Sequence, residues 1–520
     1  MPLGLKNLIS LRTLTVFFVG KVVGCKLNEL HALKHLEGHL LIKNLENVGD
    51  ARDCAEVNFK GKQRLESLKF SWNDQGGDEE VSKERSVDVL ENLQPHSDLK
   101  ILEIEGYMGS RFASWMMMKP FFPKMVKVSL VKCRNVENLP PFSELPLLRD
   151  LLLKDMVAVK SIEGRGGNGF PCLKKLTLEN LPNLESFVLK EDSGAVSSLP
   201  SLAELMITGC PRLENMPLLL PSLERLKVMK CCGEKLVQSL LMLPSLKKTA
   251  ATSTLTRLKI LEIKECSDLI SLPENWLRVL ISLEELVIEN CSSLISLEDE
   301  GFADSELVIT SLTISGLPKL VCLPQWIQNL TKLQTLDIFF CDGLIDVPVW
   351  IWELTSLLNL RIWRCGKLKS LPDGMQSLTA LEALGIIGCY NMMMWPNGLG
   401  SLVSLKGLVI GCTPNLPSLP EELQQLTALR HLRIFNCETM LALPEWLLNF
   451  TSLQIFGIYS CNNLQSLPDW FPKLTSLQQL EIFLCDELTS RCQKGTGVDW
   501  PNIAHIPNIQ LNSEWIQGEA

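Results

Sequence analysis

One phrase returns along most of this 520-residue chain, and its copies share the form L-x-x-L-x-I-x-x-C-x-x-L-x-x-L-P. We call the ninth position of this frame the cysteine slot. From Leu317 to Cys485 the slot advances by 24 residues seven times in succession, and upstream the interval varies between 21 and 35 residues. About nineteen frames can be counted from Leu11 onward. A unit of this length cannot bury its own apolar side chains, so the copies must stack on one another in a one-dimensional array.

The spacing within the frame indicates how each copy folds. Its L-x-L segment alternates with period two, which predicts a short strand with inward leucines that pairs in parallel with the strands of neighbouring copies. The L-x-x-L-P segment favours an irregular or 3₁₀ outer turn, because proline ends a helix. This pattern is the leucine-rich-repeat signature. It predicts an α/β-type solenoid, a leucine-rich-repeat horseshoe with a parallel concave β-sheet and mostly irregular or 3₁₀ outer turns.

Interruptions of the frame suggest three regions. Residues 1–250 form an irregular N-terminal half of the solenoid, with an acidic insertion at 73–89 that we expect to be a solvated loop around Asp78, Glu79 and Glu80. Residues 251–490 carry the regular 24-residue repeats, and residues 491–520 leave the frame as a C-terminal tail or cap.

Cysteine occupies the slot in many copies, which raises the question of a ligand, a disulfide or a nucleophile. Leu317 and Met156 take the same slot elsewhere, and neither a metal site nor a nucleophilic centre would tolerate that exchange. A disulfide between adjacent copies is geometrically feasible. We expect a buried structural thiol that donates weakly to a backbone carbonyl. The slot cysteines are Cys133, Cys210, Cys231, Cys266, Cys291, Cys341, Cys365, Cys389, Cys437, Cys461 and Cys485.

Motifs for catalysis are missing from the sequence. There is no P-loop, no G-x-S-x-G and no C-x-x-C pair. His31, His35 and His39 recur at intervals of four, but the frame places His39 at a strand entrance, so a connector is favoured over a zinc site. We therefore expect no enzyme, no metal and no cofactor in this chain.

Composition narrows the class of partner and the compartment. A net charge of −9 argues against a nucleic-acid partner, and no apolar block is long enough to span a membrane. Eighteen cysteines in 520 residues are too few for a disulfide-rich secreted scaffold, and the N-terminus lacks a convincing signal peptide. We expect a protein of the cytoplasm or the nucleus.

Outward positions of the strands are the more informative candidates for function. Two positions before the slot the C-terminal copies carry mostly aromatic residues, whereas the upstream copies are mostly polar or charged. Aromatic residues and arginine are typical of interaction hot spots, and ordinary cross-strand packing is the alternative interpretation. The predicted partner-binding residues of the concave face are Asp337, Phe339, Arg361, Trp363, His431, Arg433, Phe435, Tyr459 and Phe483.

Four longer phrases carry a family resemblance: MPLGLKNLISLRTLTVFFVGK at the start, LEGHLLIKNLENVGDARDCAEVNFKGKQRLESLKFSW from Leu36, LQPHSDLKILEIEGYMGSRFASWM from Leu93, and RCQKGTGVDWPNIAHIPNIQL near the end. They resemble the C-terminal leucine-rich-repeat region of plant coiled-coil-type nucleotide-binding leucine-rich-repeat (NLR) disease resistance proteins. The resemblance implies a ligand- or effector-recognition module of an intracellular immune receptor, with a role in the defence response.

What the resemblance implies about partners goes further. The repeats would bind a pathogen effector or a guarded host protein, and would contact the nucleotide-binding domain of the parent receptor. ADP or ATP is expected only on that domain, which the sequence does not include, so we expect a fragment of a receptor. The alternative is an adaptor or inhibitor-type leucine-rich-repeat scaffold for protein–protein interaction. A secreted receptor ectodomain is a third class.

Overall fold

The computed structural model describes residues 4–21, 25–73, 79–117, 122–165, 169–190, 199–217, 219–231, 234–241, 255–299, 307–411, 416 and 419–518. Contacts divide the chain into two compact units, residues 1–266 and 267–520, which we call unit 1 and unit 2. The boundary predicted at residues 250 and 251 lies outside the described residues.

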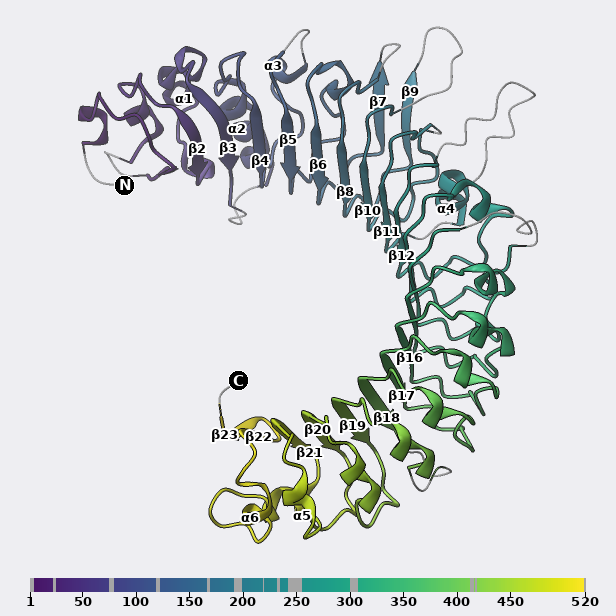
Figure 1. Ribbon diagram of the computed structural model, residues 1–520. Coiled ribbons are helices and arrows are strands. Elements are labelled where there is room, and N and C mark those ends of the chain that lie inside the picture. Colours follow the sequence, from purple (N-terminus) through teal and green to yellow (C-terminus); the bar gives the residue numbers. More distant parts are fainter. Residues whose placement is uncertain are drawn as a thin grey trace. The chain divides into compact units, whose positions relative to one another are not determined.

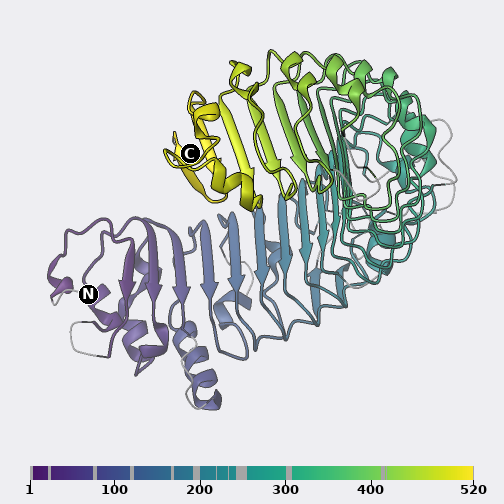
Figure 2. The same ribbon diagram turned by 90° about the horizontal axis from the view of Figure 1, so that it is seen from below.

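Unit 1 is built on a ladder of short strands, each parallel to its neighbours. In Figure 2 these strands stand side by side. They are β1 (Val16–Phe18), β2 (Gly38–Lys43), β3 (Leu65–Ser71), β4 (Ile101–Glu105), β5 (Lys127–Val131), β6 (Asp150–Lys154), β8 (Lys175–Glu179), β10 (Glu204–Thr208), β11 (Arg225–Met229) and β12 (Ile260–Lys264). A separate parallel pair, β7 (Ser161–Arg165) with β9 (Ser186–Lys190), lies outside this ladder.

Unit 2 continues the same design with a regular register. From β14 to β21, paired residues of neighbouring strands are 24 positions apart, as the frame requires. The strands are β13 (Glu285–Glu289), β14 (Ser311–Ser315), β15 (Thr335–Phe339), β16 (Asn359–Trp363), β17 (Ala383–Ile387), β18 (Gly407–Gly411), β19 (His431–Phe435), β20 (Ile455–Tyr459) and β21 (Gln479–Phe483). With the ten strands of unit 1, these nine make nineteen repeat strands in the described part of the chain.

Short helical segments connect the strands. In Figure 1 the strands of unit 2 line the inner side of its curve, and the 3₁₀ segments lie on the outer side. Unit 2 has η6 (Trp276–Val279), η7 (Gln325–Asn329), η8 (Val349–Glu353), η9 (Met375–Ser377), η10 (Leu399–Ser401), η11 (Glu421–Gln425), η12 (Glu445–Asn449) and η13 (Phe471–Lys473). Unit 1 has η1 (Leu5–Asn7), η2 (Leu27–Leu30), η3 (Leu45–Asn47), η4 (Phe59–Gly61) and η5 (Phe142–Glu144). The predicted leucine-rich-repeat solenoid with 3₁₀ outer turns is confirmed for each unit.

Six α-helices interrupt the described pattern: α1 (Arg52–Val57), α2 (Glu79–Glu91), α3 (Ser114–Met117), α4 (Glu234–Leu241), α5 (Asp486–Arg491) and α6 (Trp500–Ile503). The prediction of a solvated loop at 73–89 is wrong from Glu79 onward, because α2 begins there; Asp78 lies outside the described residues. Glutamate and lysine favour a helix, and the frame places no strand in this stretch.

Residues 491–520 add to the sheet. After α6, β22 (Asn508–Leu511) pairs in parallel with β21, and β23 (Glu514–Gln517) turns back antiparallel to β22. The edge of β21 is therefore covered by one more strand of the same direction.

The cysteine slot closes the turn that follows each strand. Cys365 is fully buried, and its thiol lies 3.7 Å from the Trp363 carbonyl oxygen and 3.9 Å from that of Ile338. Arg364, directly before the slot, has φ of 53°, so the chain turns there through the left-handed region. Burial as a free structural thiol is found at most slot cysteines. Cys437 is disulfide-bonded, and the expectation of a free thiol is wrong there.

Candidate functional site

The nine predicted partner-binding residues all lie on strands of unit 2 and on one face of its sheet. Strand alternation puts Leu336 and Ile338 into the core and leaves Asp337 and Phe339 on the opposite face. Parallel register then sets Asp337 beside Arg361, and Phe339 beside Trp363. The structure gathers eight of them into two clusters, which we call the β15–β16 cluster and the β19–β21 cluster, and His431 belongs to neither.

The β15–β16 cluster consists of Asp337, Phe339, Arg361 and Trp363. Arg361 donates from Nε and Nη2 to the two carboxylate oxygens of Asp337 at 2.6 and 2.5 Å. Its guanidinium carbon lies 5.5 Å from the centre of the Phe339 ring and 5.9 Å from that of Trp363. These two rings stack with centres 5.0 Å apart. The cluster is an arginine held in one place by a carboxylate and two aromatic faces.

Asp337 and Arg361 differ in exposure. The Asp337 side chain is 7% exposed, whereas that of Arg361 is 42% exposed. Burial raises the pKa of Asp337 above its ordinary value, although the hydrogen bond and the charge of Arg361 oppose the shift. The carboxylate is therefore an internal support, and the guanidinium is the group that faces outward.

The β19–β21 cluster consists of Arg433, Phe435, Tyr459, Glu481 and Phe483. Three rings stack in a row, with centres 4.3 Å apart between Phe435 and Tyr459, and 5.1 Å apart between Tyr459 and Phe483. These distances match the spacing of neighbouring strands, so parallel register alone brings the rings into contact.

Glu481 is the centre of the polar network in this cluster. Arg433 reaches across β20 and donates to it from Nε at 2.8 Å and from Nη2 at 2.9 Å. The Tyr459 hydroxyl and the Gln479 amide also donate to its carboxylate. Burial alone would raise the pKa of Glu481, but these hydrogen bonds outweigh it and hold the pKa below its ordinary value. Burial and the bond to Glu481 raise the pKa of Tyr459 to about 12.

Two glycines make room for the clusters. A Cβ atom on Gly457 would lie 2.6 Å from Tyr459 Cε2 and 3.0 Å from both Arg433 Cγ and Glu481 Oε2. A Cβ atom on Gly385 would lie 2.7 Å from Trp363 Nε1, a buried nitrogen with no hydrogen-bond partner among the described residues. Only glycine therefore allows Arg433 to cross β20 and the indole to lie over β17.

Some site residues were placed by the sequence and others were missed. His431 lies at the start of β19 with its side chain largely exposed, and partial burial of the ring together with the charges of Arg433 and Arg430 lowers its pKa. Glu481, Gln479, Gly385 and Gly457 are absent from the predicted set. Three of them lie four positions before the slot, the same column as Arg361 and Arg433, and this shared column is the signal that could have found them.

The corresponding face of unit 1 has different chemistry. Lysine–glutamate pairs join neighbouring strands, with Nζ to Oε distances of 2.6–3.3 Å in five examples: Lys69–Glu105, Lys127–Glu103, Lys154–Glu179, Lys175–Glu204 and Lys227–Glu262. Such partly exposed pairs contribute little to stability individually. Aromatic anchors are instead concentrated on the face of unit 2.

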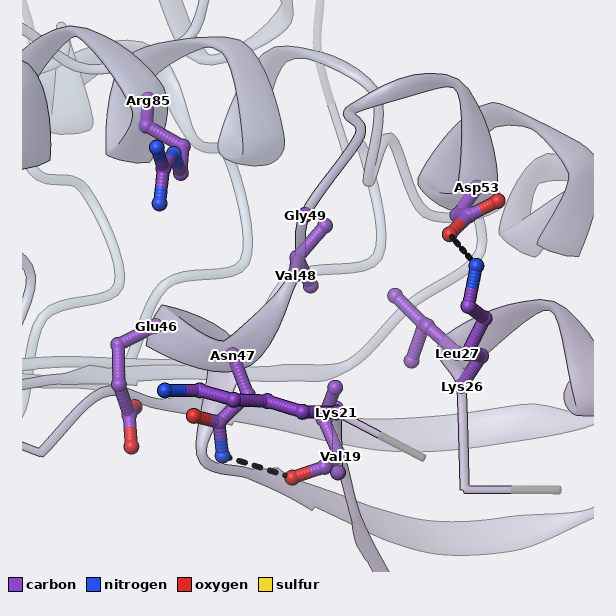
Figure 3. Close-up of a pocket in the computed structure, with 11 residues that line it drawn as sticks. Val19, Lys21, Lys26, Leu27, Glu46, Asn47, Val48, Gly49, Asp53 and Arg85 are labelled. Atoms are coloured by element: carbon purple, nitrogen blue, oxygen red, sulfur yellow. Dashed lines mark hydrogen bonds and ion pairs between the residues drawn. The ribbon is translucent and has the colours of Figure 1, made fainter. Parts of the chain in front are cut away.

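Unit 1 also holds a pocket of about 330 Å³ (Figure 3). Lys26 pairs with Asp53 at 3.6 Å, and Lys21, Glu46 and Arg85 contribute further charges to its lining. The described part of the chain contains no cluster of side chains suited to a metal ion. The mixed charges of the pocket favour no single class of ligand.

In comparisons with known proteins, the chain matches two family models and is similar to several plant proteins. The model described as R13L1/DRL21 LRRs matches residues 27–156, and the model described as a leucine-rich repeat region matches residues 307–492. The putative disease resistance RPP13-like protein 1 of Arabidopsis thaliana is 32% identical over 42% of this chain and 22% of its own length. The putative disease resistance protein RGA4 of Solanum bulbocastanum is 34% identical over 53% of this chain and 27% of its own length.

Among solved structures, the TLR13 chain of a TLR13–ssRNA13 complex matches 92% of this chain and 59% of its own length, with 18% identity and a TM-score of 0.47. The two plant relatives are matched over 22% and 27% of their own length, so this chain spans about a quarter of each. None of the helices in the described ranges is long and apolar enough to cross a membrane.

Proposed function

We propose, from the premise that this chain is a leucine-rich-repeat region of the kind found in plant disease resistance proteins, that it is the recognition module of an intracellular immune receptor. The ligand would be a protein, either a pathogen effector or a host protein that such an effector modifies. The face of unit 2 that carries the β15–β16 and β19–β21 clusters would bind it. Leucine-rich-repeat regions are interaction modules, and this role requires no catalysis.

The observation that supports this proposal is the contrast between the two units. Unit 2 presents stacked aromatic rings and two ordered arginines on one sheet face, whereas unit 1 presents paired lysines and glutamates. Large aromatic side chains and arginine supply most of the binding energy at protein interfaces. Because their partners in the sheet already restrain them, little side-chain entropy would be lost on binding.

The remaining parts of the proposal concern the parent protein. We propose that unit 1 contacts the nucleotide-binding domain of a longer receptor, that ADP or ATP binds on that domain alone, and that the receptor acts in the cytoplasm or nucleus. The share of the plant relatives that this chain matches is consistent with a region of a longer protein.

Site-directed photo-crosslinking tests the binding face. p-Benzoylphenylalanine at Phe435 keeps a ring in the stack and probes the proposed surface. The same residue at Val403, which is 63% exposed near the outer segment η10, is the matched control. Full-length chain expressed in pathogen-challenged plant tissue should give a defined crosslinked protein from position 435 and none from position 403.

Two outcomes would contradict the proposal. Equal crosslinking from both positions would show that the aromatic face has no special role. A host protein that is captured equally and in the same unmodified form with and without challenge, with no pathogen protein beside it, would favour an adaptor or inhibitor-type scaffold over an effector-recognition module.

A further inference from the structure

Two arginines at β16 are held against aromatic rings, although their side chains are long and flexible. Arg361 lies over Phe339 and Trp363, and the guanidinium carbon of Arg364 lies 5.5 Å from the centre of the Phe340 ring. The arginines are three positions apart in the sequence, roughly 10 Å of extended chain, so one peptide segment can reach both. We call these five residues the β16 arginine site.

The exposed charge of this site is positive. Asp337 is its acidic neighbour, and its buried carboxylate uses only the Nε and Nη2 atoms of Arg361. A guanidinium has five N–H donors, so donors of Arg361 remain for another acceptor. Arg364 is exposed and forms no ion pair with any of the described residues.

Other acidic groups nearby are already engaged. Asp342, on the preceding repeat, accepts a hydrogen bond from the Gly366 backbone nitrogen at 3.1 Å. Glu382, on the following repeat, pairs with Lys406 at 2.6 Å. Arg361, Arg364 and Asp337 together carry a net charge of +1. The charge of Asp342, which a hydrogen bond from a backbone N–H does not cancel, lowers the local excess further, so the site suits one carboxylate better than a phosphate dianion.

We propose that the β16 arginine site binds an aspartate or glutamate side chain in an acidic segment of the protein partner. The inference rests on the proposed recognition function and specifies its chemistry. Arg361 would donate to the carboxylate, the charge of Arg364 would attract the same acidic segment, and the rings of Phe339, Phe340 and Trp363 would shield these contacts from water. Arginine suits this role because its planar donors match the geometry of a carboxylate. Stacking of the guanidinium on the aromatic rings also holds the side chain in place before the partner binds.

Selection from a random peptide library tests this chemistry on the full chain. Wild-type chain should enrich aspartate and glutamate at least twofold over the starting library. A selected acidic peptide should bind at least tenfold more tightly than its glutamine isostere, as measured by fluorescence anisotropy, and more weakly as salt increases. Enrichment of neutral or basic peptides would overturn the proposal.

Amino-acid substitutions test whether the acidic peptide binds at the β16 arginine site. Arg364→Gln and the neutral pair Asp337→Asn/Arg361→Gln should each weaken the acidic peptide at least fivefold. Arg430→Gln removes the same charge from an exposed residue elsewhere in unit 2 and should have no effect. If Arg364→Gln unfolds the chain, Arg364→Asn replaces it, because asparagine tolerates the φ of 53° at this position. Unchanged binding by the folded variants would overturn the proposal.

Two further results separate this inference from its alternatives. Tenfold tighter binding of a phosphoserine peptide than of the glutamate peptide would show that the site recognises a phosphate and not a carboxylate. Crosslinking of a partner from position 435 without any acidic-peptide binding at β16 would refute this inference and leave the recognition function standing.

Discussion

At the residue scale, the missing side chain of Gly457 is as important as any side chain of the β19–β21 cluster. In Gly457→Ala the new methyl group would collide with Tyr459 and Arg433 and loosen their bonds to Glu481. We expect the free energy of unfolding to fall by about 1–3 kcal/mol. Urea denaturation monitored by circular dichroism measures this change.

Gly407→Ala is the matched control on the same sheet face. Its Cβ would meet only Ala383 Cβ at 3.9 Å, an ordinary contact, so stability should stay within about 0.5 kcal/mol or rise. Equal losses in the two variants would show a general cost of alanine in these strands, and not a requirement for space at residue 457.

Lys62 offers a prediction about pH, since burial lowers its pKa from 10.5 to about 8. Its ammonium donates to the carbonyl oxygens of Leu30 and Leu33 at 2.9 and 2.8 Å. Between pH 8 and 10 the unfolded chain binds the Lys62 proton more strongly than the folded chain does. The free energy of unfolding should therefore rise by roughly 2 kcal/mol relative to Lys62→Met, measured as the difference between their denaturation curves. If the difference in free energy of unfolding between wild type and Lys62→Met stayed constant from pH 8 to 10, the lowered pKa of Lys62 would be contradicted.

At the element scale, the carboxylates of Glu481 and Asp337 each support an arginine. Their contributions to the free energy of unfolding should change in opposite directions as the pH falls. The lowered pKa of Glu481 means that its contribution to stability is present above about pH 4.5 and is lost as the pH falls through its folded value. Glu481→Gln should cost about 1–3 kcal/mol at pH 7, because it leaves a half-buried Arg433 without its ion pair. This deficit should narrow towards pH 3.5.

Asp337→Asn is the counterpart on β15. The pKa of Asp337 is raised, so its ionised form is less favourable in the folded chain, and wild type should gain stability relative to this variant as the pH falls towards 3.8. Denaturation series between pH 3.5 and 7 on both variants give the two slopes. Slopes of the same sign would refute the distinction between the clusters.

At the scale of the whole molecule, most of the fold could be predicted because the repeat interval determines how neighbouring strands pair. A frame such as Leu360, Ile362 and Cys365 fixes which side chains are buried, and the interval of 24 residues fixes which strands pair. The same reasoning placed Arg361 and Trp363 beside Asp337 and Phe339. Their ability to bind a partner stays a prediction.

What escaped prediction depends on contacts that the frame does not encode. Arg433 and Glu481 are 48 residues apart and meet only because Gly457 leaves the intervening strand open. In the sequence, Gly457 has no side chain that would mark it as part of a binding face. Helix α2 was missed because its mostly polar sequence breaks the repeat and carries no strand pattern of its own.

The slot cysteines allow the core of both units to be tested in one experiment. Burial raises the pKa of Cys133 to about 12 and that of Cys341 to about 11, so little thiolate is present at pH 7, and neither sulfur is exposed. Cys322, on an outer turn, is exposed. Native chain treated with a thiol reagent should be modified at Cys322 at least a hundredfold faster than at Cys133 or Cys341, as read by peptide mass spectrometry. In denaturant the three rates should converge, because the protection comes from folding and not from the local sequence. Fast modification of Cys341 in native chain would show that the slot opens by local unfolding, and would contradict its protection by the packed repeat core.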